Sequence, residues 1–308
     1  MLISDSLYKN KSEVLAYFRS RAEESIQEDI ITYGIAQYKQ RASLANKAAQ
    51  ETRDLLVLNL IQAAKRDHWS NEATQNNLLM LYYCANVVML ESRHSIWPYE
   101  YMTFSRRIGE IWEPFCKLCF EYPVAGDVNL YVPPLFEDVR RRLLRDIRDY
   151  ISQLSITNEE KMQLVGYYDK VWSLVTSGEI KLELDLHFEK AGVRYAIDMK
   201  SGFSSNEKGN TNRLLLVGSV YKNLEKEDYR CLIFVRSEEE SNNHYLQTLK
   251  KSGIWEVYCC AEAYDKISEF SGFDLRKWID SYVNWASDLN ADTADDFKQQ
   301  DLMKYLEW

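Results

Sequence analysis

The sequence predicts an α/β (α+β) protein in which a large helical N-terminal portion precedes a mixed sheet core flanked by helices. Two observations predict this fold class. Good helix formers dominate the first hundred residues, where no glycine occurs between Gly34 and Gly109. From about residue 180 onward, short runs of alternating apolar and polar residues, as in strands, are separated by segments of helical character. We therefore expect a helical region first and the sheet after it.

Three regions are expected along the chain. Residues 1–98 form a helical N-terminal region, which includes the apolar run 78–90. Residues 99–265 form the sheet core, with a helical insertion at about 121–175. Residues 266–308 form a C-terminal helical extension, whose aromatic residues recur at helical spacing and are expected to pack against the core.

Composition limits the class of protein. The chain has 308 residues, of which 46% are hydrophobic, so it can bury a substantial core. No run approaches the roughly 18 apolar residues that span a bilayer, and the N-terminus lacks the apolar stretch of a secretory signal, so a cytoplasmic location is expected. Six cysteines show no disulfide framework. Cys116 and Cys119 lie on an apolar helix, where buried thiols are expected rather than a zinc site.

The segment 180–200 predicts a β-hairpin. Apolar and polar residues alternate along 180–188 and again along 193–200, which is the period of strands with one buried face. The connection 189–192 contains a glycine and is short enough for an antiparallel turn. His187 falls on the polar side of the first strand, where a surface position is expected.

The polar face of this hairpin carries an acidic cluster. If Phe188 pairs with Val193, Glu183 lies opposite Asp198, and Asp185 lies opposite a small residue on the same face. Carboxylates this close destabilise a sheet and resist joint ionisation unless a cation lies between them. A divalent metal ion supplies that charge, and Mg²⁺ favours sites with one or two carboxylates and several waters. The sequence therefore predicts a Mg²⁺ site here.

Lys200 is expected to project to the same face, two residues after Asp198. Its ammonium could orient or deprotonate a water molecule and offset negative charge in a transition state. Two carboxylates, a metal ion and an ammonium are a minimum set for metal-assisted phosphodiester hydrolysis. The alternative is a solvated face of an edge hairpin that carries mixed charges.

A polar loop is expected at 201–212, because this stretch is rich in Gly, Ser, Asn and Thr. Its side chains suit hydrogen bonds to phosphates and base edges, although it could also be a connection without a ligand. The candidates for DNA contact are Ser201, Ser204, Ser205, Asn206, Lys208, Asn210, Asn212 and Arg213.

The remaining elements of the core follow in alternation. A helix is expected at 213–223, capped by Thr211 or Asn212. After it we expect a buried strand at 229–235, a helix at 242–251 and a strand at 254–260. The order is therefore hairpin, helix, strand, helix, strand.

Asp185…Asp198-Met199-Lys200 has the pattern D-x₁₂-D-x-K across a hairpin, followed by a Ser/Gly-rich loop, a helix and an apolar strand. This pattern resembles the PD-(D/E)xK nuclease superfamily, and with the large helical region the chain resembles a type II restriction endonuclease over about residues 100–260. The resemblance implies a restriction-endonuclease-like sheet core flanked by helices.

The resemblance also implies roles for these residues. Asp185 and Asp198 would bind Mg²⁺, with Mn²⁺ as a substitute, the main-chain carbonyl of Met199 would complete the coordination, and Lys200 would assist the attacking water. The residue before Asp185 is a leucine rather than the proline of the family pattern, so Glu183 stays open as an alternative first acid.

In many members of the superfamily a glutamate on the helix before the hairpin joins the site. The segment 105–115 offers Glu110 and Glu113. Glu110 is the preferred catalytic candidate, because Ile108 and Trp112 are expected to face the core beside it.

Basic residues cluster although the net charge is −9. Five arginines lie within nine residues on the predicted helix after Pro133-Pro134. Arg141 and Arg145 are the candidates for phosphate contacts, because counterion release supplies much of the affinity for DNA. Alternatively these arginines pair with acids on their own helix.

The expected function is Mg²⁺-dependent, sequence-specific cleavage of double-stranded DNA within a restriction-modification system. A homodimer is expected, because duplex cutting usually needs two sites and a twofold axis matches a palindromic target. The helical region 1–98 is a possible platform for dimerisation or DNA binding, and neither a nucleotide cofactor nor a membrane is expected. The alternatives are a PD-(D/E)xK nuclease of repair, transposition or defence, and a DNA-binding or scaffold protein without catalysis.

Overall fold

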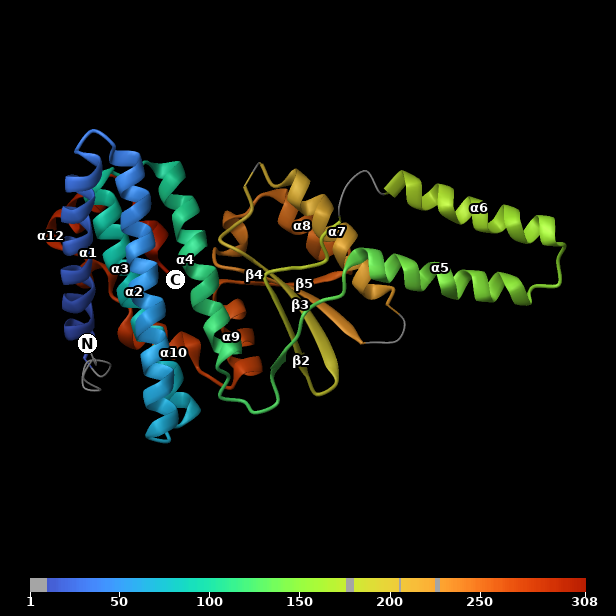
Figure 1. Ribbon diagram of the computed structural model, residues 1–308, viewed down its shortest axis with the longest axis horizontal. Helices are drawn as coiled ribbons and strands as arrows, with labels where there is room; N and C mark the ends of the chain where they lie inside the picture. The colour runs from blue at the N-terminus through green and yellow to red at the C-terminus, as the bar shows by residue number, and fades with distance from the viewer. Residues whose placement is uncertain (1–9, 176–179, 205, 225–227) are drawn as a thin grey trace.

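The N-terminal part of the chain is helical, as predicted. The structure is a computed structural model that describes residues 10–175, 180–204, 206–224 and 228–308. Four long helices come first (Figure 1): α1 (Lys11–Tyr33), α2 (Tyr38–Arg66), α3 (Asn71–Ile96) and α4 (Tyr101–Glu121). Helix α3 is buried on nearly every side over its second half, because α1, α2 and α4 pack around its apolar run.

A five-stranded mixed sheet follows the helices, so the predicted fold class is confirmed. Its strands lie in the order β1-β2-β3-β4-β5, with β1/β2 and β2/β3 antiparallel and β3/β4 and β4/β5 parallel. The strands are β1 (Asn129–Leu130), β2 (Leu186–Lys190), β3 (Val193–Lys200), β4 (Tyr229–Val235) and β5 (Trp255–Cys259).

Helices cover both faces of the sheet. One face shares a hydrophobic core with α3, α4 and α9 (Cys260–Ser271). The other face packs against α7 (Lys208–Lys222) and α8 (His244–Lys251), which connect β3 to β4 and β4 to β5. Helix α7 packs closely against the residue before β5. A Cβ added to Gly218 would lie only 2.5 Å from Cγ2 of Ile254, so only a glycine fits there. The predicted order of hairpin, helix, strand, helix, strand is correct.

The predicted register of the hairpin is wrong by two residues. Phe188 pairs with Tyr195, not with Val193. Only Ala191 and Gly192 form the turn, and their φ angles are 52° and 79°, which is the left-handed geometry of a two-residue hairpin. The strands therefore continue two residues closer to the turn, and Glu183 does not lie opposite Asp198.

Helix α7 begins earlier than predicted. It starts at Lys208 after the N-cap Glu207, so Thr211 and Asn212 lie within the helix and do not cap it. Thr211 is buried against the core, which shows that tertiary packing overrides the preference of such polar residues for loops and caps. The polar stretch that follows β3 therefore ends before Lys208.

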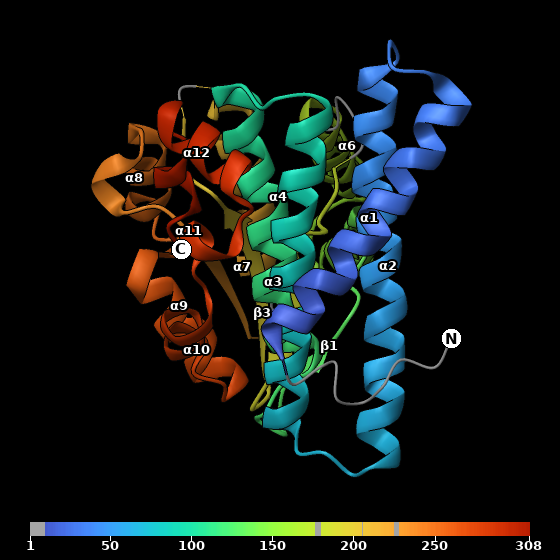
Figure 2. The ribbon, with the colours of Figure 1, turned by 90° about the vertical axis from the view of Figure 1, so that its left-hand side faces the viewer.

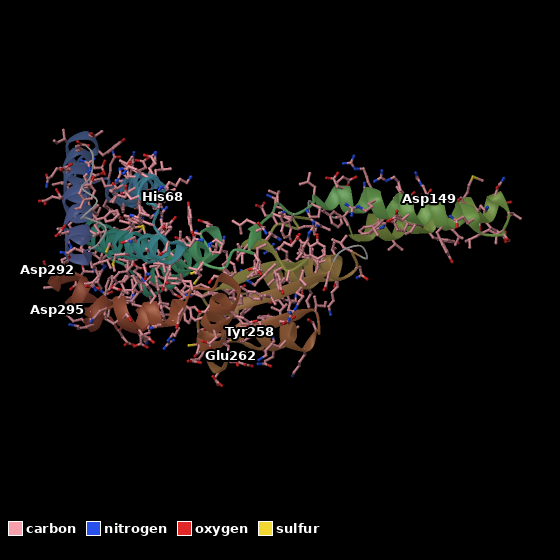
Figure 3. The ribbon with its side chains drawn as sticks, turned by 90° about the horizontal axis from the view of Figure 1, so that it is seen from below. His68, Asp149, Tyr258, Glu262, Asp292 and Asp295 are labelled. Carbon is pink, nitrogen blue, oxygen red and sulfur yellow. The ribbon has the colours of Figure 1, made fainter. Side chains whose placement is uncertain are left out.

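Two helices project from the body as an arm. They are α5 (Phe136–Gln153) and α6 (Asn158–Val175), which run antiparallel after the edge strand β1. Figure 1 and Figure 3 both show the arm extending away from the sheet and from the N-terminal helices.

The C-terminal segment returns to the N-terminal helices (Figure 2). After α9 come α10 (Leu275–Tyr282), α11 (Trp285–Asp288), α12 (Ala291–Gln299) and the last turn Met303–Leu306. Buried apolar residues of these elements belong to the same core as α3 and α4. All six cysteines are free, five of them buried, as expected for Cys116 and Cys119. No helix among the described residues is long and apolar enough to cross a membrane.

Polar contacts around two buried carboxylates join α1, α3 and the C-terminal segment. The carboxylate of Glu91, only 4% exposed, accepts two hydrogen bonds from Arg19 at 2.7 and 3.0 Å and one from the backbone N–H of Asn290 at 2.6 Å. The hydroxyl of Tyr83 donates to Asp288 at 2.7 Å. Because an unpaired buried charge costs several kcal/mol, these partners hold the chain's two ends together.

We expect Glu91→Gln to lower the free energy of unfolding by about 1–3 kcal/mol, because the amide leaves a guanidinium and a backbone donor poorly satisfied. Urea unfolding followed by circular dichroism measures this loss. The matched control is Glu28→Gln on exposed α1 surface, for which a change within about 0.5 kcal/mol is expected. Equal stability of both variants would show that Glu91 does not anchor the C-terminal segment.

Candidate functional site

Asp185, Asp198 and Lys200 meet at the carboxyl end of β3. Asp185 lies in a bend directly before β2, so the antiparallel ladder places it beside the end of β3. Its Oδ2 accepts a hydrogen bond of 2.6 Å from the backbone N–H of Met199, between the other two residues. The carboxylate of Asp185 is thereby fixed to β3 itself.

Asp198 lies between two cations. Its side chain is fully buried, with Oδ2 2.5 Å from Nζ of Lys200 and Oδ1 3.4 Å from Nη2 of Arg213. The same ammonium lies 3.9 Å from Oδ2 of Asp185. The site opens to solvent through Asp185, Lys200 and Arg213, whose side chains are 25%, 20% and 41% exposed.

Burial dominates the electrostatics of Asp198. Loss of water raises the pKa of its carboxyl to about 6, and the nearby carboxylate of Asp185 adds to this rise, whereas the ammonium of Lys200 opposes it. Burial by itself disfavours the charged form of Lys200, but the two carboxylates together outweigh burial and raise the pKa of Lys200. The ammonium is therefore held protonated at neutral pH.

His187 is buried, not on the surface as predicted. Its Nε2 accepts a hydrogen bond of 2.9 Å from the backbone N–H of Leu184, so the ring is a neutral imidazole. Burial lowers the pKa of His187 to about 4. The hydrogen bond spans the bend that contains Asp185, so His187 helps to position that carboxylate.

The donor set fits a small divalent cation with few protein ligands. No group of three metal-ligating side chains occurs among the described residues. The site offers two carboxylates and the carbonyl of Met199, to which Nζ of Lys200 donates at 3.3 Å. Oδ2 of Asp198 is buried and accepts no well-directed hydrogen bond despite its contact with Lys200. Mg²⁺ suits such a site, because it keeps several of its waters.

The two glutamates of α4 face different neighbours. Glu110 is paired with Arg106 at 2.8 Å and Arg107 at 2.7 Å, and it lines a surface pocket against α2 and α3. Helix α4 comes close to the residue after Lys200 at Gly109, where an added Cβ would lie 3.3 Å from Cβ of Ser201. Glu113 is itself paired with Lys117 at 2.6 Å, so both glutamates are held by cations of their own helix.

Glu183, the alternative first acid, lies outside the cluster. Its side chain is exposed and lines a pocket formed with the segment 132–137 at the base of the arm. The corrected register is the cause, because it brings Asp185 to the end of β3 and moves Glu183 beyond the ladder.

The polar loop supplies both structural and solvent-facing residues. The hydroxyl of Ser201 accepts a hydrogen bond of 3.1 Å from Nε of Arg236, which ties it into the core. Ser204 and Asn206 are exposed beyond it. Ser205 lies outside the described residues.

The other predicted contact residues lie on the first turns of α7. Lys208 and Asn212 are exposed, whereas the amide of Asn210 donates to Glu207 at 3.0 Å. Arg213 reaches Asp198, a contact that the sequence did not predict because the start of α7 was placed too late.

The predicted phosphate contacts on α5 differ in their pairing. Arg141 is bound to Asp138 at 2.6 Å. Arg145 is exposed and has no ion-pair partner among the residues described here. Only Arg145 is therefore available without breaking an ion pair.

Comparisons with known proteins find no match: no family model, no curated protein and no solved structure is similar to this chain. The function is therefore argued from the geometry of the site.

Because the folded pKa of His187 is about 4 and the unfolded value about 6.5, the unfolded chain binds the extra proton between these pH values. Stability is therefore retained above pH 6.5 and lost as the pH falls toward 4, by about 3 kcal/mol. We expect His187→Gln to remove this part of the pH dependence in urea unfolding at pH 7 and pH 4.5, and His244→Gln, on the exposed side of α8, to keep it. An identical loss in wild type and His187→Gln would contradict this role.

Proposed function

We propose that this chain is a Mg²⁺-dependent endonuclease that hydrolyses phosphodiester bonds of double-stranded DNA at specific sequences, in the manner of type II restriction endonucleases of the PD-(D/E)xK superfamily. The observation that carries the proposal is the convergence of Asp185, Asp198 and Lys200. Asp185 directly precedes β2, Asp198 and Lys200 lie on β3, and both carboxylates are within 4 Å of Nζ of Lys200.

The topology around the cluster supports the same proposal. The hairpin β2-β3 carries the acids and the lysine, and α7 then leads to β4, which is parallel to β3. This order agrees with the hairpin, helix and strand that the resemblance implies. The cluster lies at the carboxyl end of β3, where side chains can reach solvent beyond the sheet.

The residues have defined roles in this proposal. Asp185, Asp198 and the carbonyl of Met199 would hold Mg²⁺, or Mn²⁺ in its place, which when bound supplies Lewis-acid polarisation of the phosphate. Lys200 holds a protonated Nζ beside both carboxylates, where it can orient water and offset charge that develops on the phosphate. Arg213 adds a second, half-exposed positive charge.

Recognition of DNA is assigned to the rim beside this cluster. Ser204, Asn206, Lys208 and Asn212 are exposed there and carry donors and acceptors for phosphates and base edges. We propose a homodimer acting on the duplex, because two cleavage sites related by a twofold axis match a palindromic sequence. No nucleotide cofactor is required for direct attack of water.

One observation favours a second candidate, a DNA-binding protein without catalysis. Lys200 and Arg213 already neutralise Asp198, so the cluster is close to charge balance without a metal ion. Isothermal titration with Mg²⁺ or Mn²⁺ separates the two candidates, because a catalytic site binds the ion through Asp185 and Asp198 and a purely structural cluster does not.

We expect Asp198→Asn to abolish cleavage of a long duplex while DNA binding persists, because the change removes a ligand but keeps the shape. Lys200→Ala should lower the rate by a factor on the order of 10² or more. The control is Glu183→Gln, an exposed acid two residues from Asp185 that should cut at the wild-type rate. Cleavage by Asp198→Asn near the wild-type rate, in a gel assay with Mg²⁺, would end the proposal.

Arg145→Ala should weaken binding to specific and non-specific duplexes alike, because the guanidinium neutralises a phosphate. The slope of log K against log salt should then flatten by about one unit. Arg141→Ala is the matched variant, and a smaller change is expected because Arg141 is held by Asp138. Fluorescence anisotropy without divalent ions measures both slopes. An unchanged slope for Arg145→Ala would assign α5 to surface ion pairing.

A further inference from the structure

The arm formed by α5 and α6 has little support from the rest of the molecule. Within the described part of the chain, the only extensive helix contact that either helix makes is with the other. The arm meets the body at its base, where Phe136 and Val139 of α5 belong to the core shared with α7 and the sheet, and then extends into solvent (Figures 1 and 3). Two helices alone bury little apolar surface, so such a pair usually gains stability from a further layer.

Exposed apolar side chains are concentrated on this arm and at its base. Nine of the seventeen large hydrophobic residues that are exposed among those described lie within residues 130–171. Isolated exposed apolar residues are ordinary, but a concentration of them marks a surface that another molecule covers. The nine are Leu130, Val132, Leu135, Tyr150, Ile156, Met162, Leu164, Tyr167 and Val171.

Helix α6 carries two apolar stripes with the 3-4 spacing of helix-packing seams. The stripe of Val165, Tyr168 and Trp172 is half-buried and faces α5. The second stripe consists of Leu164, Tyr167 and Val171, which are 41%, 61% and 59% exposed. We call these three residues the outer stripe. It has the pattern of a seam, and in the described part of the chain no other helix packs on it; Nζ of Lys170, on the same helix, lies 5.3 Å from the centroid of the Tyr167 ring.

Helical geometry separates the outer stripe from the arginines of α5. Each residue turns a helix by about 100°. In an antiparallel pair packed through the buried residues of both helices, Arg141 and Arg145 then lie on one face of the arm and the outer stripe lies on the opposite face. Met162 shares the face of the arginines, and Tyr150 on α5 lies on the face of the outer stripe.

We propose that the outer stripe is the interface of a homodimer, in which α6 of one protomer packs against α6 of a second copy about a twofold axis. The two arms would form a four-helix arrangement in which each supplies the layer that the other lacks. The inference extends the homodimer of the proposed nuclease, but its evidence lies in the arm alone.

The charges beside the outer stripe favour a second copy of this chain as the partner. Arg142 and Asp146 both lie on this side of α5, and neither has an ion-pair partner among the residues that the structure describes. In a twofold pair the guanidinium of each arm can meet the carboxylate of the other, so that two ion pairs form together. A polyanion such as DNA would be attracted to only one of these charges.

The size of the arm sets the affinity expected. A helix of 18 residues is about 27 Å long, so contact between two α6 helices about 10 Å wide covers roughly 300 Å² per protomer. Contacts between α5 of one protomer and α6 of the other about double this area, to roughly 600 Å² per protomer. The total for both protomers is roughly 1,200 Å². That is the lower end of specific interfaces. We therefore expect a reversible dimer with a Kd in the micromolar range.

Sedimentation velocity on the metal-free full chain without DNA tests the interface at about 1–100 µM protein. We expect concentration-dependent dimers in the wild type. Tyr167→Glu and Val171→Glu should each raise the dimer Kd on the order of 100-fold, because every dimer contains the buried charge twice. Met162→Glu, an equally exposed apolar residue on the opposite face, should leave the Kd unchanged. Circular dichroism establishes that each variant is folded.

Exchange of the charges tests the twofold arrangement. Arg142→Asp should weaken the dimer, and the double variant Arg142→Asp/Asp146→Arg should restore it. A wild type that stays monomeric up to about 100 µM, or a dimer that tolerates Tyr167→Glu, would overturn the interface. If the wild type is monomeric and substitution of the outer stripe weakens duplex binding, the stripe is a DNA contact. That result also overturns the dimer interface. None of these outcomes depends on cleavage, so failure of the proposed function is seen separately in the Asp198→Asn assay.

Discussion

The negative charge of a fully buried carboxylate has to be balanced by groups of the protein itself, and the residues around Asp198 meet this constraint. Water cannot stabilise the charge, so the ammonium of Lys200 and the guanidinium of Arg213 do so at 2.5 and 3.4 Å. The first lies on the same strand, but the second requires α7 to begin directly after a short loop. The position of α7, and with it the parallel strand β4, is thereby coupled to the charge at the end of β3.

The burial of Asp198 depends in turn on elements that are remote in sequence. Both faces of β3 are covered, one by α7 and α8 and the other by the core shared with α3, α4 and the C-terminal segment. Arg236 links the chain's end to the site, since it donates to the carbonyls of Tyr305 and Glu307 at 3.1 and 2.8 Å and to the hydroxyl of Ser201. Burial disfavours the charged form of Arg236 and lowers its pKa, so the guanidinium depends on these hydrogen bonds for stabilisation. The C-terminal return therefore stabilises the residue that follows Lys200.

Local patterns predicted the elements of this region well and their relative positions less well. The strand at 229–235 was predicted with its observed bounds, because a continuous apolar run between polar segments has few other interpretations. The hairpin was predicted, but its register was not, because a glycine at position 192 is compatible with turns of two or four residues. His187 was assigned to the surface for a different reason. A one-sided alternation does not show that α7 covers the polar face as well, where the ring of His187 meets Tyr221.

The sequence by itself determined the α/β fold class, the helical first part, the order of the core elements and the grouping of Asp185, Asp198 and Lys200. These follow from periodicity and from spacing along paired strands, which depend on near neighbours in the chain. The tertiary structure alone decided that Arg213 joins Asp198, that Glu110 is paired with Arg106 and Arg107, that Glu183 lies outside the cluster and that α6 presents an uncovered stripe. These depend on turn geometry, on the rotation of each helix about its axis and on packing between segments far apart in sequence, which no local pattern contains.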